Sequence, residues 1–205
     1  MGSMALERQG SGRVLRTDGE RGSSAPGAGT MGITLFLASL TMLFAGSLVA
    51  VVWVRISADQ WPPAGAPALP RLLWLSTALL VGCSVTIHSA LVAIRRGDQR
   101  GLQRRLILTA VLAALFLASQ AVGWFRFFDA AVFESHLYSF SFYVLTGLHA
   151  AHVIGGIVAL AVVLVMTYRG CYTWAHYPGI RNTAIYWHFL DAVWLVLFAF
   201  LLATG

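Results

Sequence analysis

One short run of the sequence places a histidine and a carboxylate three residues apart in an apolar setting. His188 and Asp191 lie within YWHFLDAVW (residues 186–194), and this spacing puts both side chains on one face of a helix. An ionised Asp at the middle of a membrane helix costs about 2.5–3.5 kcal/mol on insertion scales, so it should face a partner and not lipid. We predict that His188 and Asp191 form a polar packing node, with the indoles of Trp187 and Trp194 packed over it.

A second pair of histidines lies in LTGLHAAHVIGG (residues 145–156). His149 and His152 offer two ligands to a metal, whereas zinc, copper and iron sites need three or four. His188 and Asp191 would complete such a set, so a metal site is one interpretation of these residues. The preferred interpretation is that the imidazoles are buried and hydrogen bonded to neighbouring helices, as buried polar groups usually are.

The same run carries small residues at intervals of four. Gly147, Ala151, Gly155 and Ala159 form a stripe on which another helix can approach closely, as small residues do in membrane proteins. The stripe predicts that this helix is central to a bundle. The histidines include no pairs on two helices spaced as a bis-histidine haem bundle requires, so we predict no redox cofactor in this chain.

The composition is that of an integral membrane protein. Hydrophobic residues make up 58% of the 205 residues and charged residues 11%, against about 25% charged in soluble domains. The net charge of +6 comes from arginines that flank apolar stretches, which gives no reason to expect nucleic-acid binding. Cys83 and Cys171 do not have the spacing of a disulfide framework or of a thiolate metal site.

Five apolar stretches are long enough to cross a hydrocarbon core of about 30 Å. We therefore predict an all-α membrane protein, a bundle of five transmembrane helices in one domain covering residues 31–205. Residues 1–30 lack an apolar run and are predicted to form a disordered cytoplasmic tail. The predicted spans are residues 32–54, 72–94, 106–125, 137–168 and 183–202.

The arginines predict the orientation. With the N-terminus in the cytoplasm and the C-terminus outside, eleven arginines would lie inside and three outside, as the excess of basic residues in cytoplasmic loops requires. Near the ends of the spans, Trp61, His88 and Arg169 are candidates for contact with lipid headgroups. For His88 a buried contact, and for Arg169 an ordinary flanking charge, are the alternatives.

Taken in order, several motifs resemble subunit III of the haem-copper terminal oxidases. They are LFLASLTMLFAG (residues 35–46), WPP (61–63), RRGDQRGLQ (95–103), TGLHAAHVIGG (146–156) and YWHFLDAVW (186–194). The similarity covers nearly the whole chain from about Gly32, and the size resembles that of the short, five-helix bacterial form.

This resemblance implies a subunit without cofactors of its own. Such a subunit docks on catalytic subunit I, in a complex that also contains subunit II, binds phospholipid, and supports proton uptake while the complex reduces oxygen to water and pumps protons. Haem and copper would then belong to the partner subunits, and the complex would reside in the bacterial plasma membrane. The electron donor, cytochrome c or quinol, is decided by other chains.

The sequence departs from this family at three acids. Leu40, Gly123 and Arg181 stand where the family usually has a glutamate, so family roles that depend on those carboxylates do not transfer to this chain. Asp191 is then the only acid inside the predicted membrane region. We expect it to serve as a structural anchor.

Three other functions fit parts of the sequence. The same fold would suit an accessory protein of nitric oxide reduction, which the identity of the co-purified haem protein would distinguish. A stand-alone membrane metalloenzyme would use His149, His152 and His188, and metal analysis would reveal it. A proton or solute carrier would need several charges along a path through the membrane, where this chain has only Asp191.

Overall fold

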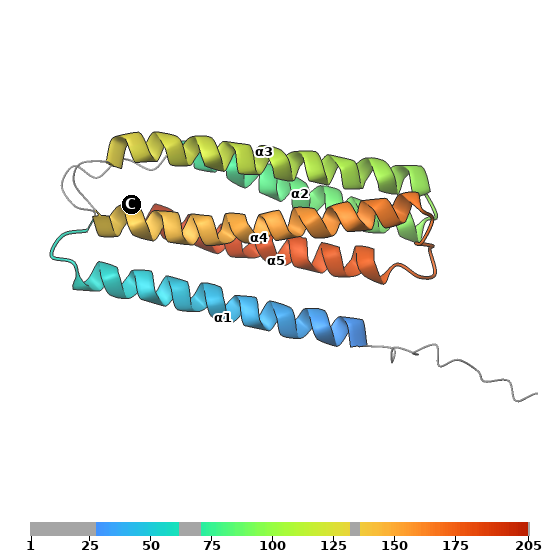
Figure 1. Cartoon of the computed structure of the whole chain (residues 1–205), viewed down its shortest axis with the longest axis horizontal. Coiled ribbons are helices and arrows are strands. Elements are labelled where there is room, and N and C mark those ends of the chain that lie inside the picture. The colour runs from blue at the N-terminus through green and yellow to red at the C-terminus, as the bar shows by residue number, and fades with distance from the viewer. Residues whose placement is uncertain (1–27, 62–70, 132–135, 205) are drawn as a thin grey trace, which may run out of the picture.

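The computed structural model describes residues 28–61, 71–131 and 136–204, and these residues form five long helices (Figure 1). Each helix is long and apolar enough to cross a membrane, so the prediction of an all-α protein with five transmembrane helices is confirmed. The helices are α1 (Ala28–Ser57), α2 (Leu72–Arg95), α3 (Gln99–Ala131), α4 (His136–Tyr168) and α5 (Pro178–Thr204).

Four of the helices form a closed ring and the fifth lies outside it. In the ring α2 packs on α3, α3 on α4, α4 on α5, and α5 on α2, with successive helices antiparallel (Figure 1). Helix α1 lies along the outer edge, where it contacts α4 and α5. It begins at one end of the bundle and α5 ends at the other, so the two ends of the described chain lie on opposite sides.

Hydroxyl groups join α2 to α3. The hydroxyls of Ser76 and Ser119 lie 2.7 Å apart, and those of Thr86 and Thr109 lie 2.8 Å apart. Each of these threonine hydroxyls also lies within hydrogen-bond distance of a carbonyl of its own helix. Because a hydroxyl has a single hydrogen, one threonine of the pair donates to its own carbonyl while the other donates across to it. The α2–α3 hairpin is therefore held by polar bonds as well as by packing.

Helix α3 begins at Gln99, several residues before the predicted Leu106. The chain turns sharply at Gly97, whose φ of 71° is a conformation that glycine adopts without strain. The Asp98 carboxylate then accepts the N–H of Gly101 at 2.8 Å and caps the first turn of the helix. The predicted start was set by hydropathy and so fell at the first apolar residue. The helix itself begins earlier, directly after the capping residue Asp98.

Helix α5 also begins early, at Pro178 instead of the predicted Thr183. Proline is favoured at the first helical position because its missing N–H would have no partner there. The predicted tail, residues 1–30, lies outside the described residues except that α1 already begins at Ala28. Helix α4 spans about 50 Å at 1.5 Å per residue, which is longer than a bilayer requires, as its sequence predicted.

A buried tyrosine organises the link between α4 and α5. The Tyr172 hydroxyl donates to the Met166 sulfur at 3.3 Å, and the Tyr172 carbonyl accepts from Gln99 Nε2 of α3 at 3.0 Å. Burial, with a smaller effect of Cys171, raises the pKa of Tyr172, which keeps the hydroxyl protonated and able to donate. A side chain at Gly179 would overlap that hydroxyl, so the glycine permits the contact.

Candidate functional site

The interior of the bundle contains a histidine enclosed by aromatic rings. His149 of α4 is fully buried, and its ring centroid lies 5.1 Å from that of Trp194, 5.8 Å from Phe116 and 6.3 Å from Phe44. We call these four residues the inner aromatic cluster. Neither ring nitrogen of His149 has a hydrogen-bond partner among the described residues, contrary to the expected bonds to neighbouring helices. In this cluster His149 therefore acts as a packed ring.

The second histidine of the pair has different surroundings. His152 Nδ1 lies 2.7 Å from the Leu148 carbonyl of its own helix, and its ring centroid is 5.2 Å from that of Phe44 in α1. The Tyr186 hydroxyl of α5 donates to the His152 carbonyl at 2.9 Å. His152 thus helps to join α1, α4 and α5.

The histidines do not converge on a common ligand position. Within the described residues, no group of three or more His, Cys, Asp or Glu side chains is placed to hold a metal ion. His149 lies among aromatic rings, His152 bonds its own helix, and His188 faces α2. The metalloenzyme interpretation therefore has no ligand set in this part of the chain.

A second polar group lies at the outer side of α2 and α5. His188 Nδ1 and the Ser84 hydroxyl are hydrogen bonded at 2.6 Å, and the same hydroxyl is the side-chain hydrogen-bonding neighbour of Asp191. The His88 ring centroid lies 6.0 Å from that of His188. His88 is exposed and the other three side chains are half-buried. We call these four residues the outer polar face.

The outer polar face brings together His188 and Asp191, with a residue that the sequence analysis missed. Ser84 of α2 lies beside both side chains, so the pair bonds across to a second helix. The buried Oδ1 of Asp191 has no hydrogen-bond partner among the described residues. The sequence shows Ser84 near the middle of a span, which could have suggested a contact with another helix. Serines of membrane helices, however, commonly bond carbonyls of their own helix, so the position alone does not predict such a contact.

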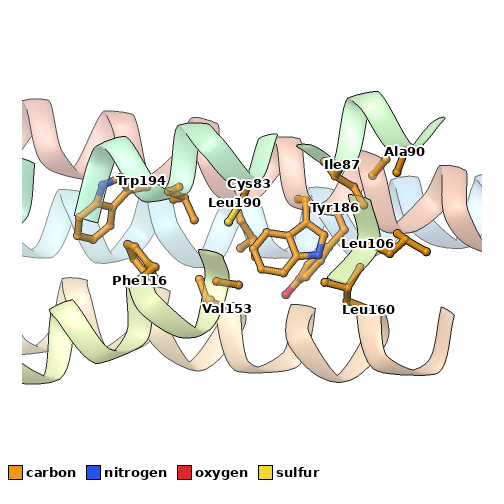
Figure 2. Close-up of a cluster of buried hydrophobic side chains, with 14 of the residues drawn as sticks. Cys83, Ile87, Ala90, Leu106, Phe116, Val153, Leu160, Tyr186, Leu190 and Trp194 are labelled. Atoms are coloured by element: carbon orange, nitrogen blue, oxygen red, sulfur yellow. The ribbon is translucent and has the colours of Figure 1, made fainter. Parts of the chain in front are cut away.

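The two tryptophans pack toward the interior of the bundle. Trp194 is fully buried, donates from Nε1 to the Thr77 hydroxyl at 3.0 Å, and meets Phe116 edge to face at 5.2 Å (Figure 2). Trp187 is also buried and lies against Gly156 of α4. The indoles therefore bind α5 to α2, α3 and α4, whereas His188 and Asp191 lie at the edge of this packed face, beside Ser84 of α2.

Among the glycines of α4, Gly156, beside the predicted stripe of small residues, has the closest neighbours. A Cβ built at Gly156 would lie 3.1 Å from Tyr186 and 3.3 Å from Trp187, whereas one at Gly155 would meet only the Tyr186 hydroxyl at 3.8 Å. A Cβ at Gly147 would have no neighbour within 4 Å. The role of Gly147, Ala151 and Gly155 in close packing stays a prediction. Gly156 was missed because two adjacent glycines fit two different helical faces.

The predicted headgroup contacts lie in three different places. Arg169 is exposed just after α4, Trp61 packs edge to face on Tyr138 at 5.1 Å, and His88 belongs to the outer polar face. Their contact with lipid stays a prediction. Of the positions where glutamate was expected, Leu40 and Gly123 are buried and Arg181 is exposed.

Two mostly apolar grooves lie between α1 and the ring. The first, with a volume of about 330 Å³, is lined in part by Phe36 of α1, Gly155 of α4 and Tyr186 of α5. The second, with a volume of about 250 Å³, lies between Phe44 of α1 and Val193 of α5. Ring contacts such as Phe36 with Tyr186, at 5.9 Å, bridge the gap between the helices.

Comparison with known proteins gives one consistent result. The family model described as "Cytochrome c oxidase subunit III" matches residues 19–205. The chain is 35% identical over 169 residues to cytochrome c oxidase subunit 3 of Synechocystis, which covers 82% of this chain and 72% of that protein. It is 32% identical over 172 residues to the protein of the same name from Thermostichus vulcanus, covering 83% and 85%. A probable cytochrome c oxidase subunit 3 of Nocardia farcinica is 33% identical over 176 residues, covering 85% and 87%.

Proposed function

The chain belongs to the cytochrome c oxidase subunit III family, and on this basis we propose that it is the non-catalytic third subunit of a respiratory terminal oxidase. The observation that carries the proposal is the match of the family model to residues 19–205. In this function the chain docks on catalytic subunit I, in a complex with subunit II, and supports oxygen reduction and proton translocation there. The haem and copper belong to those partners.

The interior of the bundle supports a structural function. His149 is enclosed by rings, and neither of its ring nitrogens has a hydrogen-bond partner among the described residues. The hydroxyls of α2 and α3 bond one another, and the Trp194 indole bonds Thr77. These groups hold helices together, which is what a subunit that stabilises a catalytic partner requires.

Phospholipid is the second component that we assign to this function. The grooves beside α1 are mostly apolar and lie between helices, which suits acyl chains. The first groove reaches the beginning of α5, at the end of the bundle where Arg169 follows α4. A cation at that end is suited to a lipid phosphate. Native mass spectrometry should therefore detect bound phospholipid, and Arg169→Ala should lower its occupancy while Arg71→Ala, at the other end, should not.

We further propose that the N-terminus is cytoplasmic and the C-terminus external, in a bacterial plasma membrane. The two native cysteines provide a test, because Cys171 is exposed in the α4–α5 link and Cys83 is fully buried. A membrane-impermeant maleimide should label Cys171 only after spheroplasts are permeabilised. Ala58→Cys in a Cys171→Ser background, at the other end of the bundle, should be labelled in intact spheroplasts. The reverse pattern would invert the orientation.

The main proposal is tested by purifying the tagged chain in a mild detergent. We expect the preparation to show a haem spectrum and to contain larger companion chains, and we expect the spectrum to follow those chains when the complex is separated in a harsher detergent. A stoichiometric haem or metal that stays with this chain alone would contradict a non-catalytic function. Purification without any haem-bearing companion would contradict membership of an oxidase complex.

A further inference from the structure

The outer polar face lies close to the middle of the membrane. Asp191 is the central residue of α5, about 20 Å from either end at 1.5 Å per residue, and Ser84 is near the centre of α2. A hydrocarbon core about 30 Å thick therefore contains both residues well away from the headgroups. Despite this depth, His88 is exposed at the surface of the chain, and Ser84, His188 and Asp191 are half-buried.

Three exposed hydroxyls on α1 are satisfied within their own helix. The hydroxyls of Ser39, Thr41 and Ser47 on α1 donate to carbonyls four residues earlier, at 2.8–3.1 Å, so these side chains are suited to face lipid. The exposed side of α4 carries apolar residues such as Ile154 and Val158. The outer polar face differs from both surfaces, because it presents two imidazoles and the only acid of the five spans.

The bonding capacity of these groups exceeds what the described residues provide. A carboxylate accepts several hydrogen bonds, yet the single Ser84 hydroxyl serves both Asp191 and His188. Acyl chains offer no hydrogen bond, and polar side chains within the membrane normally face a protein interior or a water-filled cavity. A second polypeptide can supply hydrogen-bonding groups to this surface at mid-membrane depth, which acyl chains cannot.

We infer that the outer polar face is where a transmembrane helix of the oxidase's catalytic partner docks, presenting a hydrogen-bond donor at mid-membrane depth toward Asp191 and His188. The inference rests on the proposed function, since it assumes that the chain works in a complex. The donor is a basic, amide or hydroxyl side chain, because the carboxylate is an acceptor. A helix that covers α2 and α5 here would remove His88 and Asp191 from lipid together.

A different chain fits this surface better than a second copy does. In a two-fold symmetric dimer a residue on the axis meets its own copy, so an axis through Asp191 would bring the two carboxylates face to face. Like charges facing each other across an interface oppose association. The complementary partner is therefore one that brings donors to this acidic centre.

The experiment uses a photoreactive benzoylphenylalanine at exposed positions of the full chain within its complex. Val81 lies three residues before Ser84 on α2, and Leu195 lies four residues after Asp191 on α5, so both flank the outer polar face. Their side chains are 40% and 43% exposed. The control position is Val158 of α4, which is 60% exposed on a helix that does not contact α2.

The inference predicts that illumination of native membranes links the derivatives at Val81 and Leu195 to a haem-bearing companion chain, and that the Val158 derivative forms no such product. If the companion co-purifies but is linked only from Val158, the docking face is wrong and the proposed function stands. Links from Val81 and Leu195 to a second copy or to lipid alone would also overturn the inference. If no haem-bearing companion co-purifies, the proposed function fails and the inference fails with it.

Discussion

The inner aromatic cluster and the outer polar face each contain a central histidine, but the two histidines differ in burial and in hydrogen bonding. His149 is fully buried among rings and has no hydrogen bond among the described residues. His188 is half-buried, shares the Ser84 hydroxyl with Asp191, and lies near the exposed His88. The first cluster joins helices of this chain to one another. The second lies at the surface, where another chain can reach it.

The difference shows that polar side chains in a membrane helix can have two roles, one in packing inside the bundle and one in contact with another chain. Inside the bundle, an imidazole can take the place of an apolar ring when its neighbours supply dispersion contacts from all sides. At the outer side, a polar group at mid-membrane depth marks the place where lipid is not the neighbour. Measuring the stability of the chain and the retention of its partner independently separates these two roles.

The largest effect should follow loss of the inner indole. Trp194→Ala removes a fully buried side chain and its bond to Thr77, and it should lower the free energy of unfolding by about 3–5 kcal/mol. The measurement is a denaturing-detergent titration followed by circular dichroism. Trp53→Ala is the control, because this indole is 71% exposed and should change stability little. Equal losses in the two variants would show that the inner cluster has no special role in stability.

Close packing of α4 on α5 gives the next largest effect. Gly156→Leu would place a side chain against Tyr186 and Trp187, which should cost about 1–3 kcal/mol through strain. Gly147→Leu, on the same helix, meets no neighbour within 4 Å and should be nearly neutral in the isolated chain. The same titration tests both. If Gly147→Leu destabilised the isolated chain as strongly, the described packing of α4 would be incorrect.

A smaller effect should follow loss of the hydroxyl shared by the outer pair. Ser84→Ala removes a hydrogen bond of His188 and a neighbour of Asp191, and it should lower the stability of the isolated chain by about 1 kcal/mol. Ser89→Ala is the matched control, since its exposed hydroxyl bonds only its own helix. Thermal unfolding in detergent should resolve the two variants. A fall for Ser89→Ala as large as that for Ser84→Ala would remove the basis for a shared bond.

The smallest effect should follow replacement of the inner imidazole itself. His149→Leu keeps an apolar side chain of similar size among the rings and removes two nitrogens that have no partner among the described residues. Its free energy of unfolding should therefore change by less than about 1 kcal/mol, since volume-conserving swaps in a core are tolerated. A loss of several kcal/mol, measured by the same titration, would mean that His149 makes a polar bond after all.

The sequence predicted the number and order of the helices because each apolar stretch alone is long enough to cross a membrane. It placed the starts of α3 and α5 too late, since Asp98 and Pro178 set those ends by local backbone chemistry and not by hydropathy. The polar turn at the start of α3 is helical although it is not apolar. Helix boundaries outside the hydrocarbon core are therefore read from capping residues.

The site was predicted in its residue types but not in its partners. The spacing of His188 and Asp191 predicts that they share one side of α5, while Ser84 lies 104 residues from His188 in the sequence and no local pattern points to it. The hydrogen bonds expected of His149 are missing because Phe116 and Trp194 occupy its surroundings. Only the packing of four helices determines which histidine is enclosed and which reaches the surface.

The most direct test of this account compares partner retention for Asp191→Asn and His149→Leu. Both variants are purified from native membranes in a mild detergent, and the haem-bearing companion is quantified per mole of this chain. Because hydrogen bonds to charged groups contribute about 1.5–3 kcal/mol, Asp191→Asn should weaken association roughly 10- to 100-fold. His149→Leu should retain the companion at the level of the unmodified chain. Full retention by Asp191→Asn, with loss of the companion from His149→Leu, would contradict the account.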